Sequence, residues 1–276
     1  MAAGSSERRR APQPERFAAA AEAERHYRRM WRLRRMDEGQ LKALLSGPAA
    51  DTVQWIESAA RYGVLPAQVR LGQMLLDGSG RPRDEAAALA WFEKGARGGS
   101  AEAMNMAGRC YENGWGAPAD LEAAARWYRL SAEAGCDWGE YNYANLLFDG
   151  RGVVRDLAAA VLWYDRSAKQ GHARAMNLLA RCCEEGWGVE SNPNLAAQWY
   201  RRSAEGGYFR AQFNWATLLA AQGRTEEALA WFEKALSAAT PDSLPAMTRA
   251  LAERDEPSLA QLGRRWNEPP AQGASA

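Results

Sequence analysis

The chain has 276 residues, a net charge of +1 and a hydrophobic content of 47%, which is enough to bury a core. No run of 18 apolar residues occurs, which excludes a membrane-spanning helix. The arginines near the start are not followed by an apolar stretch, so we expect no secretory signal and a cytoplasmic location. Alanine is abundant and β-branched residues are few, which favours helices.

Positive charge is concentrated at the start of the chain. Residues 1–36 hold ten arginines and four glutamates, so this segment carries a charge of +6 and the rest of the chain carries −5. Residues 1–14 are predicted to be disordered because they are polar and rich in arginine and proline. Residues 15–36 are predicted to form an arginine-rich helix, which could cap the segment that follows, or bind nucleic acid or an anionic membrane surface.

After this basic segment, the sequence repeats with a period of 36 residues. The same glycine returns at Gly63, Gly99, Gly135, Gly171 and Gly207. Tryptophan-led aromatic pairs begin at Trp91, Trp127, Trp163 and Trp199, and a fifth begins four residues early at Trp231. A strict period of this length indicates a stack of one supersecondary unit, in which each unit buries its apolar face against its neighbours.

The period divides the chain into segments. Residues 37–63 are predicted to form a degenerate first repeat, residues 64–206 four full repeats of 36 residues, and residues 207–236 a short final repeat. Residues 237–266 are predicted to form capping helices, because the open end of such a stack needs a cover. The last segment, residues 267–276, is predicted to be a disordered tail.

Each full repeat is predicted to be a pair of helices. The first helices are expected to start near Pro66, Ala101, Trp138, Ala173 and Phe209. They are expected to end at glycine pairs, because glycine readily adopts the left-handed conformation that follows a helix end. Side chains placed to cap the second helices are Asp84, Asp120, Asp156 and Asn192. The predicted fold class is therefore all-α, a right-handed α-solenoid of stacked antiparallel helix pairs.

Residues 211–214, 149–153 and 160–168 resemble the Sel1-like repeat, a longer relative of the tetratricopeptide repeat. The resemblance covers about residues 41–236 and implies a non-catalytic bacterial adaptor or scaffold that binds a protein or peptide partner. A cysteine-rich branch of this family has been assigned penicillin-binding or weak β-lactamase activity. That branch has a signal peptide and a cysteine pair in each repeat, and this chain shows neither pattern.

The repeats alternate, so the larger period is 72 residues. Matching residues are Asn105, Arg109 and Glu112 in one repeat, and Asn177, Arg181 and Glu184 two repeats later. Two explanations remain open. The alternation can result from the duplication of a two-repeat ancestor, and it can also reflect a ligand that contacts every second repeat.

The resemblance also implies a binding face, because first helices line the concave face of tetratricopeptide-like stacks. The predicted partner-binding residues are Asn105, Arg109, Glu112, Trp138, Tyr141, Asn145, Phe148, Arg174, Asn177, Arg181, Glu184, Arg210 and Phe213. Arginine and aromatic residues dominate interface hot spots, and asparagine can pair with a peptide backbone. The alternative is a solvated face whose aromatic residues, such as Tyr141 and Phe213, pack in the core.

The sequence predicts no catalytic residue, cofactor or metal site. Only two histidines occur, and His172 is expected to lie in a surface turn because the equivalent positions tolerate many residue types. No histidine is therefore expected to activate a nucleophile. Cys110 and Cys182 occupy a position that holds Met or Leu in other repeats, so we expect them to be core residues and not metal ligands.

Overall fold

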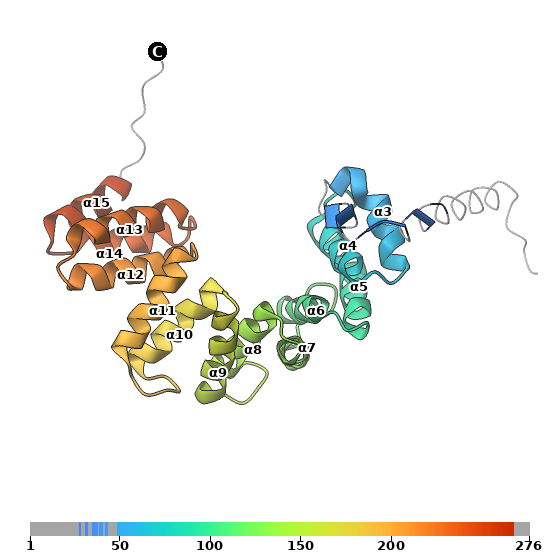
Figure 1. Ribbon diagram of the computed structural model, residues 1–276, viewed down its shortest axis with the longest axis horizontal. Coiled ribbons are helices and arrows are strands. Elements are labelled where there is room, and N and C mark those ends of the chain that lie inside the picture. Colours follow the sequence, from blue (N-terminus) through green and yellow to red (C-terminus); the bar gives the residue numbers. More distant parts are fainter. Residues whose placement is uncertain are drawn as a thin grey trace, which may run out of the picture. The chain divides into compact units, whose positions relative to one another are not determined.

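The computed structural model describes residues 49–267 and ten isolated positions between residues 28 and 43. Residues 49–267 contain thirteen α-helices and no β-strand (Figure 1). The all-α repeat fold that the sequence predicts is confirmed. The predictions for residues 1–14, for most of residues 15–36 and for nearly all of the tail lie outside the described residues.

The helices form consecutive pairs. The first helices of the pairs are α4 (Leu65–Asp77), α6 (Ala101–Asn113), α8 (Asp137–Asp149), α10 (Ala173–Glu185) and α12 (Phe209–Ala221). The second helices are α3 (Ala49–Arg61), α5 (Glu85–Arg97), α7 (Leu121–Glu133), α9 (Leu157–Lys169), α11 (Pro193–Glu205) and α13 (Thr225–Ala238). Two shorter helices follow, α14 (Leu244–Ala252) and α15 (Pro257–Asn267). Each predicted start of a first helix agrees with the structure to within one residue.

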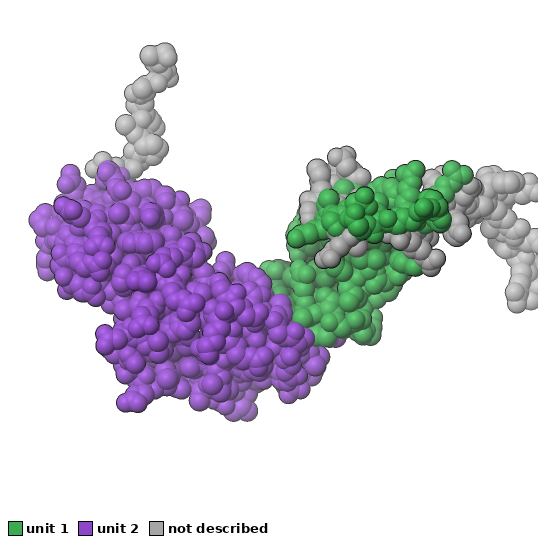
Figure 2. All heavy atoms as spheres, in the orientation of Figure 1, with its two compact units in different colours: residues 1–119 green, residues 120–276 purple. Residues whose placement is uncertain are grey.

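The chain divides into two compact units (Figure 2). Unit 1 comprises residues 1–119 and contains α3 to α6, and unit 2 comprises residues 120–276 and contains α7 to α15. The division falls between α6 and α7, which are the two helices of one sequence repeat. The compact units therefore do not follow the repeat boundaries.

Local signals in the sequence determine where the helices begin and end. The side chain of Asp156 accepts a hydrogen bond from the Ala159 N–H at the start of α9, and Asp84, Asp120 and Asn192 cap their helices in the same way. A cap of this kind contributes about 1 kcal/mol to stability. Each first helix from α4 to α10 ends at a glycine in the left-handed conformation, such as Gly150 with φ 73°. The predicted caps and stops are confirmed.

The core of each repeat is built from one large aromatic residue and several alanines. In unit 2, the side chain of Tyr164 is buried in one cluster with Ala144, Ala160 and Ala180. The small side chains let the helices approach closely, and the ring fills the space beside them. Cys182 belongs to the same cluster, and burial raises the pKa of its thiol to about 12. Cys110 is likewise buried in unit 1, so the prediction that both are core residues is confirmed.

Two sets of repeating glycines have different roles. Gly171, which belongs to the 36-residue series, has φ +100° and would carry a Cβ in open space. Gly152, the second glycine of the loop after α8, has φ +67°, and a Cβ there would lie 2.2 Å from the Leu121 carbonyl oxygen at the start of α7. Gly188 has the same relation to Leu157, at 2.3 Å. Gly116 makes the same contact with Glu85, so in three successive repeats the second loop glycine packs directly against the backbone at the start of the preceding second helix.

Replacing Gly152 by alanine should destabilise unit 2 much more than replacing Gly171. Both variants place a Cβ at positive φ, which costs about 1 kcal/mol. Only Gly152→Ala also forces the loop away from the backbone of α7, which adds about 2 kcal/mol. Urea denaturation followed by circular dichroism measures both losses in free energy of unfolding, and equal losses would show that the contact with Leu121 contributes nothing.

Candidate functional site

Eight of the predicted partner-binding residues lie on α8 and α10 of unit 2. Their spacing of three or four residues places those of each helix on one side of it. We call this surface the α8–α10 face. It consists of Trp138, Tyr141, Asn145 and Phe148 on α8, and Arg174, Asn177, Arg181 and Glu184 on α10.

A cleft of about 370 Å³ opens at one end of this face. It lies at the starts of α8, α10 and α12 and is lined by Asp137, Trp138, Gly171, His172, Ala173, Arg174, Gly206, Gly207 and Tyr208. The side chain of Trp138 is 43% exposed, although a tryptophan is costly to leave in water. Its indole meets the His172 ring edge to face, with 4.4 Å between ring centroids. The indole is therefore held in place and open to solvent.

Arg174 lies between two aromatic rings in the cleft. Its guanidinium carbon is 5.5 Å from the Trp138 ring centroid and 5.9 Å from the Tyr208 ring centroid. Within the part of the chain that the structure describes, no carboxylate lies within ion-pair distance of Arg174. Stacking of this kind orients the guanidinium and leaves its N–H groups available for a partner.

His172 contradicts the prediction of a surface turn. Its side chain is only 7% exposed, and its Nδ1 accepts a hydrogen bond from the Ala175 N–H at 3.2 Å, which caps α10. The ring also packs against Tyr141, at 4.8 Å between centroids. Burial lowers the pKa of His172, and Arg174 lowers it further, whereas Asp137 opposes the shift. The prediction failed because a cap position accepts many residue types whether or not it is exposed.

The other end of the α8–α10 face holds a second stacked arginine. The guanidinium of Arg181 lies 5.2 Å from the centroid of the Trp187 ring, which in turn packs on Phe148 at 5.4 Å. Glu184 accepts a hydrogen bond from the Tyr200 hydroxyl at 2.7 Å. Arg181, Phe148 and Glu184 are therefore each held by a direct contact with an aromatic residue.

The predicted asparagines bond to neighbouring helices. Asn177 is only 5% exposed, and its Oδ1 accepts a hydrogen bond from Asn214 Nδ2 at 3.0 Å. Asn145 Oδ1 accepts a hydrogen bond from the Tyr164 hydroxyl at 2.7 Å. Tyr141 is half-buried beside the same Tyr164 ring. These hydrogen bonds join helices inside unit 2, so the side chains of Asn145 and Asn177 already have partners within the protein.

Residues that follow α12 in the chain contact the predicted residues of this helix. Arg210 Nη2 donates to the Ser243 hydroxyl at 3.2 Å, and the Phe213 ring packs on Phe232 with 4.9 Å between centroids. Arg254, which precedes α15, donates to the Thr217 hydroxyl at 3.0 Å. The surface that remains for a partner in unit 2 is therefore narrower than the sequence suggested.

Unit 1 contains an arginine–tryptophan stack like the one at Arg181. The guanidinium of Arg109 lies 5.5 Å from the centroid of the Trp115 ring, as Arg181 does from Trp187. Asn105 is buried, with 5% exposed, like Asn177. Glu112 is half-buried on the same helix, α6. The 72-residue alternation of the sequence thus corresponds to a repeated arginine–tryptophan stack.

Sequence reasoning missed three residues of the site. His172 and Tyr208 immediately precede first helices, and Trp187 lies in a loop between two glycines. Their positions recur every 36 residues, so the sequence contained a signal. The predicted binding face was defined by positions within the first helices, whereas these three residues lie next to them.

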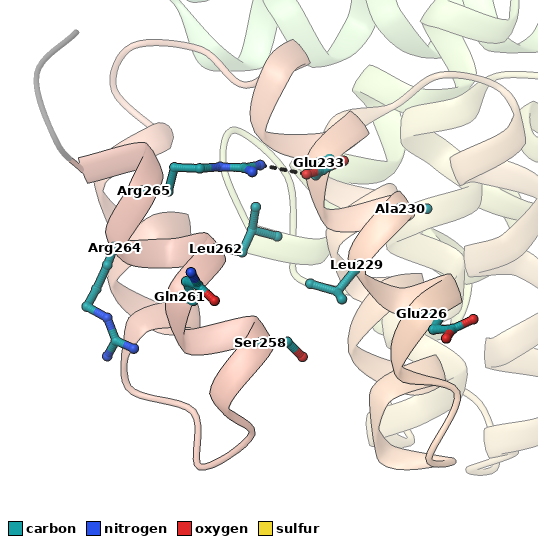
Figure 3. A pocket seen from close by; sticks show the side chains of 9 residues that line it. All are labelled: Glu226, Leu229, Ala230, Glu233, Ser258, Gln261, Leu262, Arg264 and Arg265. Atoms are coloured by element: carbon teal, nitrogen blue, oxygen red, sulfur yellow. Dashed lines mark hydrogen bonds and ion pairs between the residues drawn. The ribbon is translucent and has the colours of Figure 1, made fainter. Parts of the chain in front are cut away.

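A larger cavity of about 690 Å³ lies between α13 and α15 (Figure 3). The side chains of Leu229 and Leu262 point into it from opposite helices. Arg265 and Glu233 form an ion pair across it, at 2.6 Å. Arg264 and Glu226 also line the cavity, which therefore carries charges of both signs. None of the predicted partner-binding residues lines it.

Among the residues that the structure describes, no three His, Cys, Asp or Glu side chains are grouped to hold a metal ion. None of the described helices is both long and apolar enough to cross a membrane.

The chain is a helical-repeat protein, because successive helix pairs are joined by loops whose glycines pack against the preceding pair. The sequence profile of the Sel1 repeat matches residues 65–100, 101–136, 139–172, 173–208 and 210–239. The chain therefore belongs to the Sel1 repeat family, whose members are usually non-catalytic scaffolds for protein interactions.

Two solved structures share the fold. The Sel1 repeat protein from Oxalobacter formigenes is 28% identical with a TM-score of 0.62, over 68% of this chain and 76% of that one. The protein c5321, a protective antigen of uropathogenic Escherichia coli, is 28% identical with a TM-score of 0.68. That alignment covers 91% of this chain but only 55% of c5321, so the chain spans about half of its length. No curated protein sequence matches the chain significantly.

Stability should depend on pH through His172. Folding favours the neutral ring, so its contribution is complete above the unfolded pKa of about 6.5 and is lost as pH falls below that value toward the lowered folded pKa. His172→Asn keeps a capping side chain but removes the titration. We expect the melting temperature of the native protein to fall between pH 7.5 and 5.5, and that of the variant to fall less. Parallel pH dependence in the two proteins would contradict this role.

Proposed function

We propose that this protein is a non-catalytic cytoplasmic scaffold that binds a peptide or domain of a partner protein on the α8–α10 face. The observation that carries the proposal is a pair of stacked arginines on this face: Arg174 lies over the exposed Trp138 at one end, and Arg181 lies over Trp187 at the other. Tryptophan and arginine are the residue types that most often supply interface hot spots.

The stacking supports binding because it lowers the entropic cost of association. An arginine that must be immobilised on binding loses rotamer freedom, at a cost of about 1 kcal/mol. Arg174 and Arg181 are already oriented by the rings of Trp138 and Trp187. Less of the binding free energy is then lost in immobilising these two side chains.

Unit 1 offers a second anchor of the same chemistry, the Arg109–Trp115 stack. The penicillin-binding alternative receives no support from the cysteines, because all four are free and Cys110, Cys182 and Cys183 are buried.

The proposal is tested by capturing partners from the native host with a cross-linker. The double variant Trp138→Ala with Arg181→Glu should reduce the amount of partner captured at least about tenfold, since it removes an aromatic anchor and reverses a charge. Arg201→Glu is the matched control, because Arg201 is an exposed arginine on α11, outside the face. Circular dichroism and melting temperature confirm that each variant folds. Unchanged capture by the double variant would move the binding site away from the α8–α10 face.

A further inference from the structure

The cleft at the starts of α8, α10 and α12 contains an oriented cation next to an exposed indole. We propose that this cleft binds the acidic side chain of an internal Asp or Glu in the partner peptide, with an adjacent apolar residue of the peptide against Trp138. The inference rests on the proposed function and specifies what the partner presents.

The first argument is the state of Arg174. Several exposed arginines on the second helices have carboxylates of their own, as in the pairs Arg129–Glu133 at 3.7 Å and Arg201–Glu205 at 3.3 Å. Arg174 instead lies between Trp138 and Tyr208, with no carboxylate in ion-pair distance among the described residues. A fixed guanidinium edge is well matched to a carboxylate, to which it can donate two parallel hydrogen bonds.

The second argument is the start of α12, which borders the cleft through Gly206, Gly207 and Tyr208. Tyr208 occupies the cap position but accepts no hydrogen bond from the first turn of the helix. The N–H groups of that turn carry partial positive charge, which adds to the charge of Arg174. The start of α10 differs, because His172 caps it.

Asp137 also lines the cleft, but its carboxylate forms no ion pair with Arg174. Its Oδ1 accepts a hydrogen bond from the Trp138 N–H at 2.8 Å, so the side chain is turned to the start of its own helix. The cleft therefore combines a guanidinium that has no ion-pair partner among the described residues with the exposed indole of Trp138. A peptide side chain that is negative and has an apolar neighbour complements both features.

An internal acidic residue fits the surroundings better than a chain end. Trp138 and Arg174 line the cleft and belong to the α8–α10 face, and Phe148, Trp187 and Arg181 form a second group of contacts at the other end of that face. An extended peptide can pass from one group to the other. A peptide bound by its terminal carboxylate would end in the cleft, so its chain could extend from the cleft on one side only.

The experiment is a titration of the full chain with blocked hexapeptides, followed by the NMR signal of the Trp138 indole N–H, which Trp138→Phe assigns. The probes are acetyl-Gly-Ser-Glu-Phe-Ser-Gly-amide and its analogue with Gln in place of Glu. A third probe, acetyl-Gly-Ser-Gln-Phe with a free carboxyl terminus, tests a chain end. Inorganic phosphate tests an adventitious anion.

The key variant is Arg174→Gln, and Arg202→Gln is its matched control. Arg202 is also stacked on a tryptophan, with its guanidinium 4.7 Å from the Trp199 ring centroid, but it lies on α11 outside the cleft. We expect the Glu peptide to bind about tenfold more tightly than the Gln peptide. Arg174→Gln should remove this difference, and Arg202→Gln should preserve it.

Equal binding of the Glu and Gln peptides would overturn the proposal, as would a preference for the free chain end. Equal displacement of the indole signal by phosphate would indicate an adventitious ion only and would also overturn it. Failure here is distinguishable from failure of the proposed function. If the Trp138→Ala, Arg181→Glu variant loses its partner while the two peptides bind alike, the scaffold proposal stands and the carboxylate proposal falls.

Discussion

The structure depends on one close backbone contact, between the loop glycine of a repeat and the start of the preceding second helix. At Gly152 and Gly188 this contact leaves no room for any side chain. It requires a loop long enough to reach back, which is why the full repeat is longer than two helices and a tight turn. The short final repeat turns at Gly223 without such a loop. Helices α14 and α15 follow it, and a cavity separates α13 from α15 (Figure 3).

Because the repeats of unit 2 stack regularly, the starts of α8, α10 and α12 lie next to one another, and the cleft lies at these helix starts. His172 has two roles there, because it caps α10 and supports the indole of Trp138. A change at this position therefore affects the stability of the repeat and the shape of the cleft together. The candidate site is thus a product of the repeat geometry and needs no separate loop or insertion.

The fold was predictable because its determinants are local. Asp156 and Gly150 act on residues a few positions away, so their roles can be recognised in the sequence itself. The site was less predictable because its residues are defined by contacts between distant segments. Asn177 is bonded to Asn214 by a contact that spans a full repeat, and Arg210 is bonded to Ser243. Periodicity identifies equivalent positions, but it does not show which side chains at those positions are hydrogen-bonded to other helices of the protein.

The stacks Arg109–Trp115 and Arg181–Trp187 are separated by two repeats, and the repeat between them carries Asn145 and Arg151 at the corresponding positions. Two kinds of repeat therefore alternate, and each kind has neighbours of the other kind. A chain that gained or lost one repeat would bring two repeats of the same kind together and break the order of the surface groups. A chain that gained or lost two would preserve that order. The length of this protein can therefore change by pairs of repeats without disturbing its pattern of anchors.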